Sequence, residues 1–436
     1  MPLLRGACVF AASATASACG SDAASSSPAG SQLQWLVDTI NSGDAASEPI
    51  SAHFTEGYLA AHPAKGLADA LVKLHDKQAP LLLMGDDLPA KPGQLLVRAQ
   101  DSRARWLRIG LTTEDAAPHR MSALAIAPNG DLDPALQTWP EVLDALGTLT
   151  PDLGFVAATL RPDGCGVLQE LGSTRELAIG SNLKLYILTA LGTEVAAGRR
   201  AWTDTVAIRD EWKSLSPLEF EPAGTPHTLQ DLAERMVSAS DNTAADHLLY
   251  TLGRGTVEKA VTDSGHAAPS RMLPFLSTWE AFWLVLLATP AQQQMYVAAD
   301  VAGRRAMLDT VPRAPTDRDA ANNALLSFTS PRLLDTVGWF ASAKDLCAVT
   351  ARLMRTGEGF DILLESHGLP DLRNDYVGLG YKAGSEPGVL SVSYAVARGP
   401  DGAWFFLGMI LNDGNDAFNR ERAFYLLGAA RGQLRH

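Results

Sequence analysis

The chain has little cysteine, a deficit of positive charge and no long apolar run. Its four cysteines match neither a disulfide framework nor a zinc site, because Cys165 and Cys347 stand alone with no histidine at ligand spacing. Lys and Arg number 36 against 49 Asp and Glu, and the net charge of −13 disfavours a nucleic-acid partner. The longest apolar segment, 279–288, contains Glu280 and is too short to span a bilayer. We expect it to be a buried helix.

The composition is that of a folded chain. Hydrophobic residues make up 46% and charged residues 19% of the 436 residues, which allows a sizeable core. At roughly 100–200 residues per domain, this length predicts two to four domains. The nine histidines are scattered, and the paired glycines lack the setting of a phosphate loop. The sequence therefore indicates neither a metal site nor a cofactor.

The first 31 residues have the pattern of an export leader followed by a tether. One arginine and a small, apolar run precede Ala-Ser-Ala-Cys at 16–19, which is typical of a secretory signal over residues 1–19. The tetrapeptide resembles a bacterial lipobox, which implies a secreted, envelope-bound lipoprotein anchored through acylated Cys19. Residues 20–31 are rich in Ser, Ala and Gly and predict a flexible tether. A cytosolic tail with an incidental cysteine is the alternative.

The first folded block, residues 32–140, combines helices with a sheet. Apolar residues recur at helical spacing, and strands are predicted at 95–99, 104–111 and 121–127. Helices followed by a curved antiparallel sheet form a small α+β cone. This order resembles a steroid-isomerase-like domain, also called nuclear-transport-factor-like. The turn-rich segment 128–134 and a predicted helix then join it to the second block.

The second block spans 150–436. It begins with a strand hairpin, has a helical middle, and ends with strands between residues 376 and 412 and a helix at 419–433. We expect strands from both ends of the block to form one antiparallel sheet, covered by helices and flanked by a helical subdomain. The whole chain is thus predicted to be α+β.

Ser181 and Lys184 form the first of three short motifs that could carry chemistry. They lie three residues apart at the start of an apolar helix, so both are on one face. Free N–H groups at a helix start favour the negative charge that would develop beside Ser181. Lys184 could take the serine proton only when uncharged, which requires burial and a second cation nearby. A surface serine beside a helical lysine is the alternative.

The other two motifs follow downstream. Ser-Asp-Asn at 240–242 separates two amphipathic helices and could simply cap the second one. Lys-Ala-Gly-Ser at 382–385 lies on a predicted strand, where Lys382 is either an ordinary edge residue or the second cation. Gly384 would allow another backbone or a ligand to approach closely.

In this order, Ser-x-x-Lys, Ser-Asp-Asn and Lys-x-Gly resemble the class A serine β-lactamases and penicillin-binding proteins, over about residues 150–436. The resemblance is strongest for a subgroup that joins such a domain to an N-terminal isomerase-like domain. This subgroup includes the clavulanic-acid gene-cluster hydrolase and mycobacterial lipoproteins. Two further stretches, 274–278 and 338–342, are typical of it.

The resemblance implies roles for the first two motifs. Ser181 would be the acylated nucleophile and Lys184 the general base. Ser240 would pass a proton to the leaving group with help from Lys382, and Asn242 would orient the substrate or the general base.

The third motif departs from the family. The family has Thr in the middle, where its hydroxyl binds a substrate carboxylate, but this chain has Ala383. Ser385 or a nearby arginine would have to replace that contact. The backbone N–H groups of Ser385 and Ser181, beside Gly384, would form the oxyanion hole.

A second departure concerns the step that releases the acyl group. The family's Glu-x-x-Leu-Asn, whose glutamate activates the deacylating water, is absent between 243 and 381, and Glu280 lacks the Leu-Asn partner. An acyl-enzyme formed from a β-lactam should therefore persist. We expect a serine hydrolase for a small-molecule ester or amide, a weak esterase or a β-lactam-acylated protein rather than an efficient β-lactamase.

Two alternatives remain at this point. One is an envelope acyl transferase that resembles a DD-peptidase. The other is a non-catalytic lipoprotein that binds a small molecule or a partner, with its membrane contact made through the lipid anchor. The sequence does not predict an oligomeric state.

Overall fold

The computed structural model describes residues 27–45, 50–86, 93–128, 130, 133–315, 317–365, 378–398 and 402–435. The expected signal segment 1–19, with Cys19, lies outside this part of the chain. Two compact units are present, Met1–Ala127 and Pro128–His436. The division precedes the expected end of the first block at residue 140, because the next helix, α6 (Trp139–Gly147), packs against the last long helix of the second unit.

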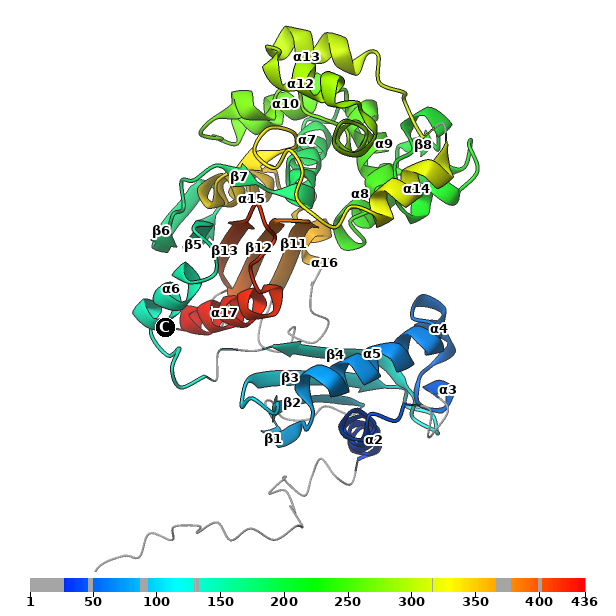
Figure 1. Cartoon of the computed structure of the whole chain (residues 1–436), viewed down its shortest axis with the longest axis vertical. Helices are drawn as coiled ribbons and strands as arrows, with labels where there is room; N and C mark the ends of the chain where they lie inside the picture. The colour runs from blue at the N-terminus through cyan, green and yellow to red at the C-terminus, as the bar shows by residue number, and fades with distance from the viewer. Residues whose placement is uncertain are drawn as a thin grey trace, which may run out of the picture. The chain divides into compact units, whose positions relative to one another are not determined.

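The first unit packs helices against one antiparallel sheet with the order β1-β2-β3-β4 (Figure 1). Its described elements are α2 (Pro28–Ser42), α3 (Ile50–His53), α4 (Glu56–Ala61), α5 (Ala64–Gln78), β1 (Leu82–Asp86), β2 (Gln94–Gln100), β3 (Trp106–Thr113) and β4 (Met121–Pro128). The three strands expected here are confirmed, and β1 is an additional one. The first unit is therefore α+β, as predicted.

Helix α2 corrects the expected extent of the tether. It begins at Pro28, inside the segment 20–31 that was expected to be flexible. Ser27 caps it, because its Oγ accepts a hydrogen bond from the backbone N–H of Gly30 (3.0 Å). Its apolar face, which includes Leu36 and Ile40, is buried in the core of this unit. Packing of that face explains why the small residues before it join the helix.

The second unit is built on a five-stranded antiparallel sheet with the order β11-β12-β13-β5-β6. Its strands are β5 (Asp152–Arg161), β6 (Gly164–Leu171), β11 (Gly378–Glu386), β12 (Val389–Arg398) and β13 (Ala403–Asn412). Strands from the two ends of the block pair directly, with Leu407 of β13 opposite Ala157 of β5. This confirms the predicted sheet. It also carries β11, with the third motif, to the sheet edge.

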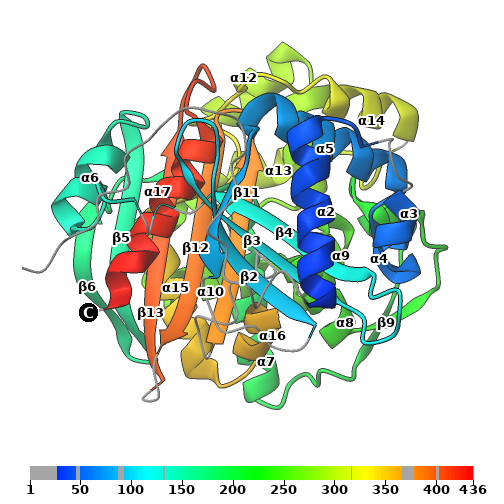
Figure 2. The same ribbon diagram turned by 90° about the horizontal axis from the view of Figure 1, so that it is seen from below.

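Helices cover both faces of this sheet. Figure 2 shows α17 (Arg420–Gly432) on the near face and α15 (Ala343–Thr356) beyond the strands. Helix α15 packs against β5, β6 and β13. The remaining described helices of the unit are α7 (Lys184–Ala196), α8 (Leu229–Ser238), α9 (Asn242–Leu252), α10 (Arg254–Asp263), α11 (Thr278–Phe282), α12 (Pro290–Ala298), α13 (Val301–Leu308), α14 (Arg318–Leu326) and α16 (Phe360–Glu365).

Helix α7 is the central helix of this unit. It packs against α9 and α10 of the helical part and against α15 beside the sheet (Figure 1). Every residue from 184 to 192 is buried, as expected for an apolar helix with neighbours on all sides. It has 13 residues. Among the described helices, none combines the length and the apolarity that a membrane crossing needs.

A disulfide corrects the expectation for the cysteines. Cys165 of β6 and Cys347 of α15 are bonded although 182 residues separate them. Their Cα atoms are 6.3 Å apart, within the usual range for a disulfide. The packing of α15 against β6 brings them together, which is a long-range contact that no local spacing of cysteines reveals.

Candidate active site

Ser181 lies on a short 3-10 turn, η2 (Gly180–Leu183), directly before α7. The neighbouring Asn182 is fully buried and holds this turn against the sheet. Its Nδ2 donates to Ser391 Oγ (2.6 Å), and that hydroxyl donates to the backbone oxygen of Ile179 (2.6 Å). The turn is thus fixed to β12, and the half-buried Ser181 is presented beside the sheet edge.

Lys184 is the centre of the site. Its side chain is fully buried, with 0% of the residue exposed. Its Nζ lies 3.2 Å from Ser181 Oγ, 3.0 Å from Ser240 Oγ and 2.7 Å from Asn242 Oδ1. The backbone oxygen of Ser240 is 2.6 Å away. Four oxygen atoms therefore surround the amine. The spacing of Ser181 and Lys184 predicted the first of these contacts, and the family resemblance implied those with the second motif.

Burial lowers the pKa of Lys184 to about 7, although the carboxylates of Asp246 and Asp241 act in the opposite direction. A substantial fraction of this amine is therefore uncharged near neutral pH. An uncharged amine has a lone pair that can accept the proton of Ser181. Of the two conditions set out from the sequence, burial accounts for the lowered pKa of Lys184, and no neighbouring cation contributes to it.

Lys382 is the second amine of the site. It lies on β11, is 3% exposed, and its Nζ is 2.9 Å from Ser240 Oγ. Burial and the charge of Lys184 lower the pKa of Lys382 well below its usual value. Ser240 Oγ thus lies between two amines. Ser181, Lys184, Ser240 and Lys382 form a continuous row of polar atoms, which we call the proton row.

The Ser-Asp-Asn turn both caps a helix and shapes the site. Ser240 has a φ of 55°, a left-handed conformation that is uncommon for a residue with a Cβ. Asp241 is the N-cap of α9 and accepts hydrogen bonds from Ala244 N (2.8 Å), Ser216 Oγ (2.8 Å) and Leu218 N (3.1 Å). These bonds hold the turn, so its capping role and its place in the site coexist.

Gly384 lets the third motif contact the serine turn. A methyl group on Gly384 would lie 2.1 Å from the backbone oxygen of Ile179 and 2.6 Å from the backbone nitrogen of Ser181. No side chain fits there. Strand β11 and turn η2 therefore touch through their backbones, which brings the N–H groups of Ser181 and Ser385 to the same end of the site.

Ser385 is exposed and bonded to an arginine that the sequence analysis did not single out. Its Oγ accepts a hydrogen bond from Arg420 Nη1 (3.1 Å), and Asp416 Oδ1 accepts one from Arg420 Nη2 (2.8 Å). Arg420 is the first residue of α17 and 35 positions from Ser385, so only the tertiary structure connects them. Ala383 is half-buried and offers no hydroxyl. Ser385 and Arg420 together occupy the place where a substitute for the missing threonine was expected.

Known protein families match the two units separately. A family model described as the β-lactamase enzyme family matches residues 156–303, which include the first two motifs. The second unit is β-lactamase-like. A different model, described as the N-terminal part of an ORF 12 gene product, matches residues 24–117. The first unit thus matches a different family model from the second. None of the curated proteins matches the chain.

Similar solved structures include a β-lactamase from Sphaerobacter thermophilus, 19% identical, which covers 68% of this chain and 96% of its own, with a TM-score of 0.46. A β-lactamase from Chitinophaga pinensis is 16% identical over 67% of this chain and 97% of its own, with a TM-score of 0.40. The protein PBP-A is 14% identical over 68% of this chain and 94% of its own, with a TM-score of 0.37.

Glu280 of the β-lactamase-like unit is bonded to groups outside the pocket at Ser181. Its Oε1 accepts a hydrogen bond from Arg254 Nη2 (2.7 Å), and its Oε2 accepts one from the backbone of Ser277 (2.8 Å) at the start of α11. Both carboxylate oxygens are thus used for an ion pair and a helix cap. Glu280 lines a cavity with Arg254 and Arg305 that is distinct from the pocket at Ser181.

The pocket at Ser181 is small and mostly apolar. Its volume is about 80 Å³. One side, which we call the apolar wall, includes Leu183, Ala281, Phe282, Val285, Phe328, Val337 and Trp339. Asn242, Thr278, Ser385 and Glu386 supply polar groups. Glu386 was not singled out from the sequence, although it is four residues beyond Lys382 on the same strand.

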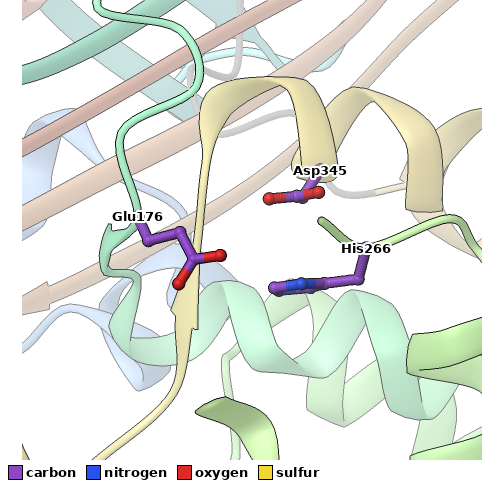
Figure 3. Close-up of side chains that lie close together, drawn as sticks. All are labelled: Glu176, His266 and Asp345. Atoms are coloured by element: carbon purple, nitrogen blue, oxygen red, sulfur yellow. The ribbon is translucent and has the colours of Figure 1, made fainter. Parts of the chain in front are cut away.

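A second group of polar side chains lies close together and could in principle ligate a metal ion: Glu176, His266 and Asp345. Figure 3 shows these side chains pointing toward one another. The histidine has no free lone pair, however. Its Nε2 donates to the backbone oxygen of Phe340 (2.8 Å), and its Nδ1 accepts from the backbone of Ala268 (3.1 Å). The donors therefore do not fit a metal ion. The cluster holds two chain segments together by hydrogen bonds.

Proposed function

We propose that the β-lactamase-like unit is a serine hydrolase that cleaves small neutral esters through an acyl-enzyme at Ser181. The observation that carries the proposal is the proton row. Successive Oγ and Nζ atoms of Ser181, Lys184, Ser240 and Lys382 lie 3.2, 3.0 and 2.9 Å apart. Two buried amines with lowered pKa values in one hydrogen-bonded row are suited to proton transfer. Without such a role, their burial would only lower the stability of the fold.

The first half-reaction follows from this geometry. Uncharged Lys184 takes the proton of Ser181 as Oγ bonds to the ester carbonyl carbon. The carbonyl oxygen becomes negative and accepts hydrogen bonds from the backbone N–H groups of Ser181 and Ser385. When the C–O bond to the alcohol breaks, Ser240 gives its proton to the leaving oxygen and is reprotonated from Lys184. Lys382 stabilises the hydroxyl of Ser240 during this exchange.

The pocket favours a neutral substrate. Binding of a hydrocarbon group against the apolar wall is favourable, because it removes apolar surface from water. The hydroxyl that would bind a substrate carboxylate is missing at Ala383, and the nearby Arg420 is already bonded to Asp416. A substrate with a carboxylate beside its scissile bond is therefore recognised poorly, which disfavours D-Ala-D-Ala peptides as well as penicillins.

A β-lactam should acylate Ser181 slowly, and the resulting acyl-enzyme should be hydrolysed slowly. Ring opening keeps the leaving group attached to the acyl group, so it stays in a pocket of about 80 Å³ and hinders water. An ester releases its alcohol, which frees space for water. Weak esterase activity with a persistent β-lactam adduct is the behaviour we propose.

We further propose that the protein is exported and anchored to the bacterial cell envelope through Cys19. The leader pattern motivates this location, and the disulfide between Cys165 and Cys347 is consistent with it. Disulfides persist in oxidising compartments and are rare in a reducing cytosol. Treating cells with labelled fatty acid and comparing wild type with Cys19→Ala tests the anchor, since the variant should lose both the label and membrane association.

For the first unit we propose the steroid-isomerase-like cone. Helices α2 and α5 pack together, and α2 packs on strands β2 and β3 of a four-stranded antiparallel sheet, which suits that architecture. An experimental structure of this unit would test it. A different strand order or an uncurved sheet would contradict the assignment.

Intact-mass spectrometry tests the proposed enzyme. Wild type and Ser181→Ala are incubated with p-nitrophenyl butanoate or with a penicillin. Wild type should gain the mass of one acyl group from either probe, release p-nitrophenol repeatedly, and keep the penicillin adduct longer. Ser181→Ala should form no adduct with either probe and should not release p-nitrophenol.

Two outcomes would favour the other functions. Absence of both adduct and turnover in wild type would point to a non-catalytic binding protein. Release of D-alanine from a D-Ala-D-Ala peptide faster than ester turnover would point to a DD-peptidase.

A further inference from the structure

Glu386 brings a carboxylate into the pocket that contains Ser181. Of the described residues that line this pocket, it alone carries a carboxyl group. The other acid considered from the sequence, Glu280, is bonded to Arg254 and lines a different cavity. A proton acceptor for a water molecule in this pocket is therefore available from β11 rather than from the helical part.

The strand geometry places Glu386 on the reactive side of β11. Side chains alternate along a strand, so positions 382, 384 and 386 share one side. Lys382 reaches Ser240 Oγ from that side, and a methyl group on Gly384 would strike the backbone nitrogen of Ser181. Glu386 is the next position on the same side, one repeat beyond the point where β11 touches the serine turn.

The surroundings of Glu386 leave its carboxyl group free to act on water. In the described part of the chain, no hydrogen bond or ion pair joins another residue to this carboxyl group; Arg420 Nη2 donates to its backbone oxygen instead (3.0 Å). Burial raises the pKa of Glu386 to about 7. A base that titrates near neutral pH is well matched to general-base catalysis at that pH.

We propose that Glu386 is the general base that activates water for deacylation of Ser181. This inference rests on the proposed function and deepens it, because it supplies the step for which the sequence offered no residue. In this step the carboxylate takes one proton from water while the water oxygen bonds to the acyl carbon. The bond between that carbon and Ser181 Oγ then breaks. The proton held by Glu386 returns to Oγ, and the acid product leaves.

The proposal explains how an ester can be turned over without the family's Glu-x-x-Leu-Asn sequence. The glutamate comes from the end of β11, on the far side of the third motif. With an ester, the departed alcohol leaves room for water between Glu386 and the acyl group. With a β-lactam, the tethered leaving group stays there, and the same base cannot be reached by water.

Pre-steady-state kinetics with p-nitrophenyl butanoate tests this role in the full-length protein. Wild type should show a rapid burst of p-nitrophenol followed by steady turnover. Glu386→Gln should keep the burst, lose steady turnover by about 100-fold or more, and accumulate the acyl-enzyme in intact-mass spectra. Glu211→Gln is the matched control, because Glu211 lies on the turn Asp210–Trp212 outside the pocket, and it should behave like wild type.

Hydroxylamine separates base catalysis from a change in pocket shape. It attacks esters without needing a general base, so it should remove the acyl group from Glu386→Gln at a rate similar to that from wild type. An acyl group that resists hydroxylamine only in this variant would overturn the proposal. Equal steady turnover by wild type and Glu386→Gln would also overturn it, while acylation of Ser181 in both would leave the proposed function intact. Absence of any adduct in wild type would instead refute the proposed function.

Discussion

Lys184 carries a large electrostatic cost at a single residue. Lowering the pKa of a lysine from 10.5 to about 7 corresponds to about 5 kcal/mol of lost preference for the charged form. Burial opposes the charge, and the nearby carboxylates of Asp241 and Asp246 only partly restore it. The surrounding core has to supply that free energy. A buried lysine in such a place is a strong indication of function.

The first prediction concerns the pH dependence of acylation. Only uncharged Lys184 can accept the serine proton, so the burst rate with p-nitrophenyl butanoate should rise through about pH 7 and level off above it. Stopped-flow measurements between about pH 5.5 and about pH 9 test this, with Ser181→Ala as the blank. A burst rate that does not change across this range, or that rises only above about pH 9, would contradict the assignment of Lys184 as base.

At the scale of the elements, the site forms where the turn before α7, the turn between α8 and α9, and strand β11 meet. Each motif lies at an element boundary, where backbone geometry is irregular and side chains can converge. The turn between α8 and α9 is strained, because Ser240 has a positive φ. The cap at Asp241 holds it there through three hydrogen bonds. In this conformation the Ser240 hydroxyl lies 3.0 Å from Lys184 Nζ and 2.9 Å from Lys382 Nζ.

The second prediction separates this strain from the chemistry. Ser240→Ala and Ser240→Gly both remove the hydroxyl between Lys184 and Lys382, and both should lower the acylation rate by about 100-fold or more. Glycine adopts a φ of 55° without a steric penalty, so the Gly variant should be more stable than the Ala variant by about 0.5–1 kcal/mol. Urea unfolding measures the difference.

An equal midpoint and slope for the two unfolding curves would contradict this prediction, because relief of the left-handed conformation would then do no more than offset the extra conformational entropy that glycine loses on folding. Undiminished acylation in both variants would remove Ser240 from the proton row.

At the scale of the whole molecule, the disulfide joins parts of the second unit that are far apart in sequence. It connects β6, in the opening hairpin, to α15 on the face of the sheet. Closing a loop of this length removes many conformations from the unfolded chain. The bond lies away from the pocket, since neither cysteine is among its lining residues. We therefore expect it to stabilise the fold without taking part in the chemistry.

The third prediction follows for the double variant Cys165→Ala/Cys347→Ala. Its free energy of unfolding should fall by about 2–5 kcal/mol, while ester turnover per folded molecule stays near that of wild type. Guanidinium unfolding of wild type with and without reductant provides the comparison, and reductant should not affect the variant. Identical unfolding curves for all samples would show that the bond is absent or contributes nothing.

Much of the second unit could be predicted from local patterns. The hairpin, the C-terminal strands and the last helix follow from periodicity and turn residues, which act over a few positions and are confirmed by β5, β6, β11, β12, β13 and α17. The four residues of the proton row were also found, because three motifs in one order are specific even when each is weak. Their distances and the shifted pKa values depend on burial and could not be predicted.

The sequence by itself determined most of the strands and helices, their order along the chain and the four residues of the proton row, since these depend on neighbours within a few positions. Only the tertiary structure decided what those residues meet. Two of these contacts join segments that are distant in sequence: the bond between Cys165 and Cys347 and the contact of Arg420 with Ser385. The position of Glu386 in the pocket depends on which segments pack over strand β11. Packing chooses those neighbours, because it minimises the exposed apolar surface of the whole unit rather than of any one segment.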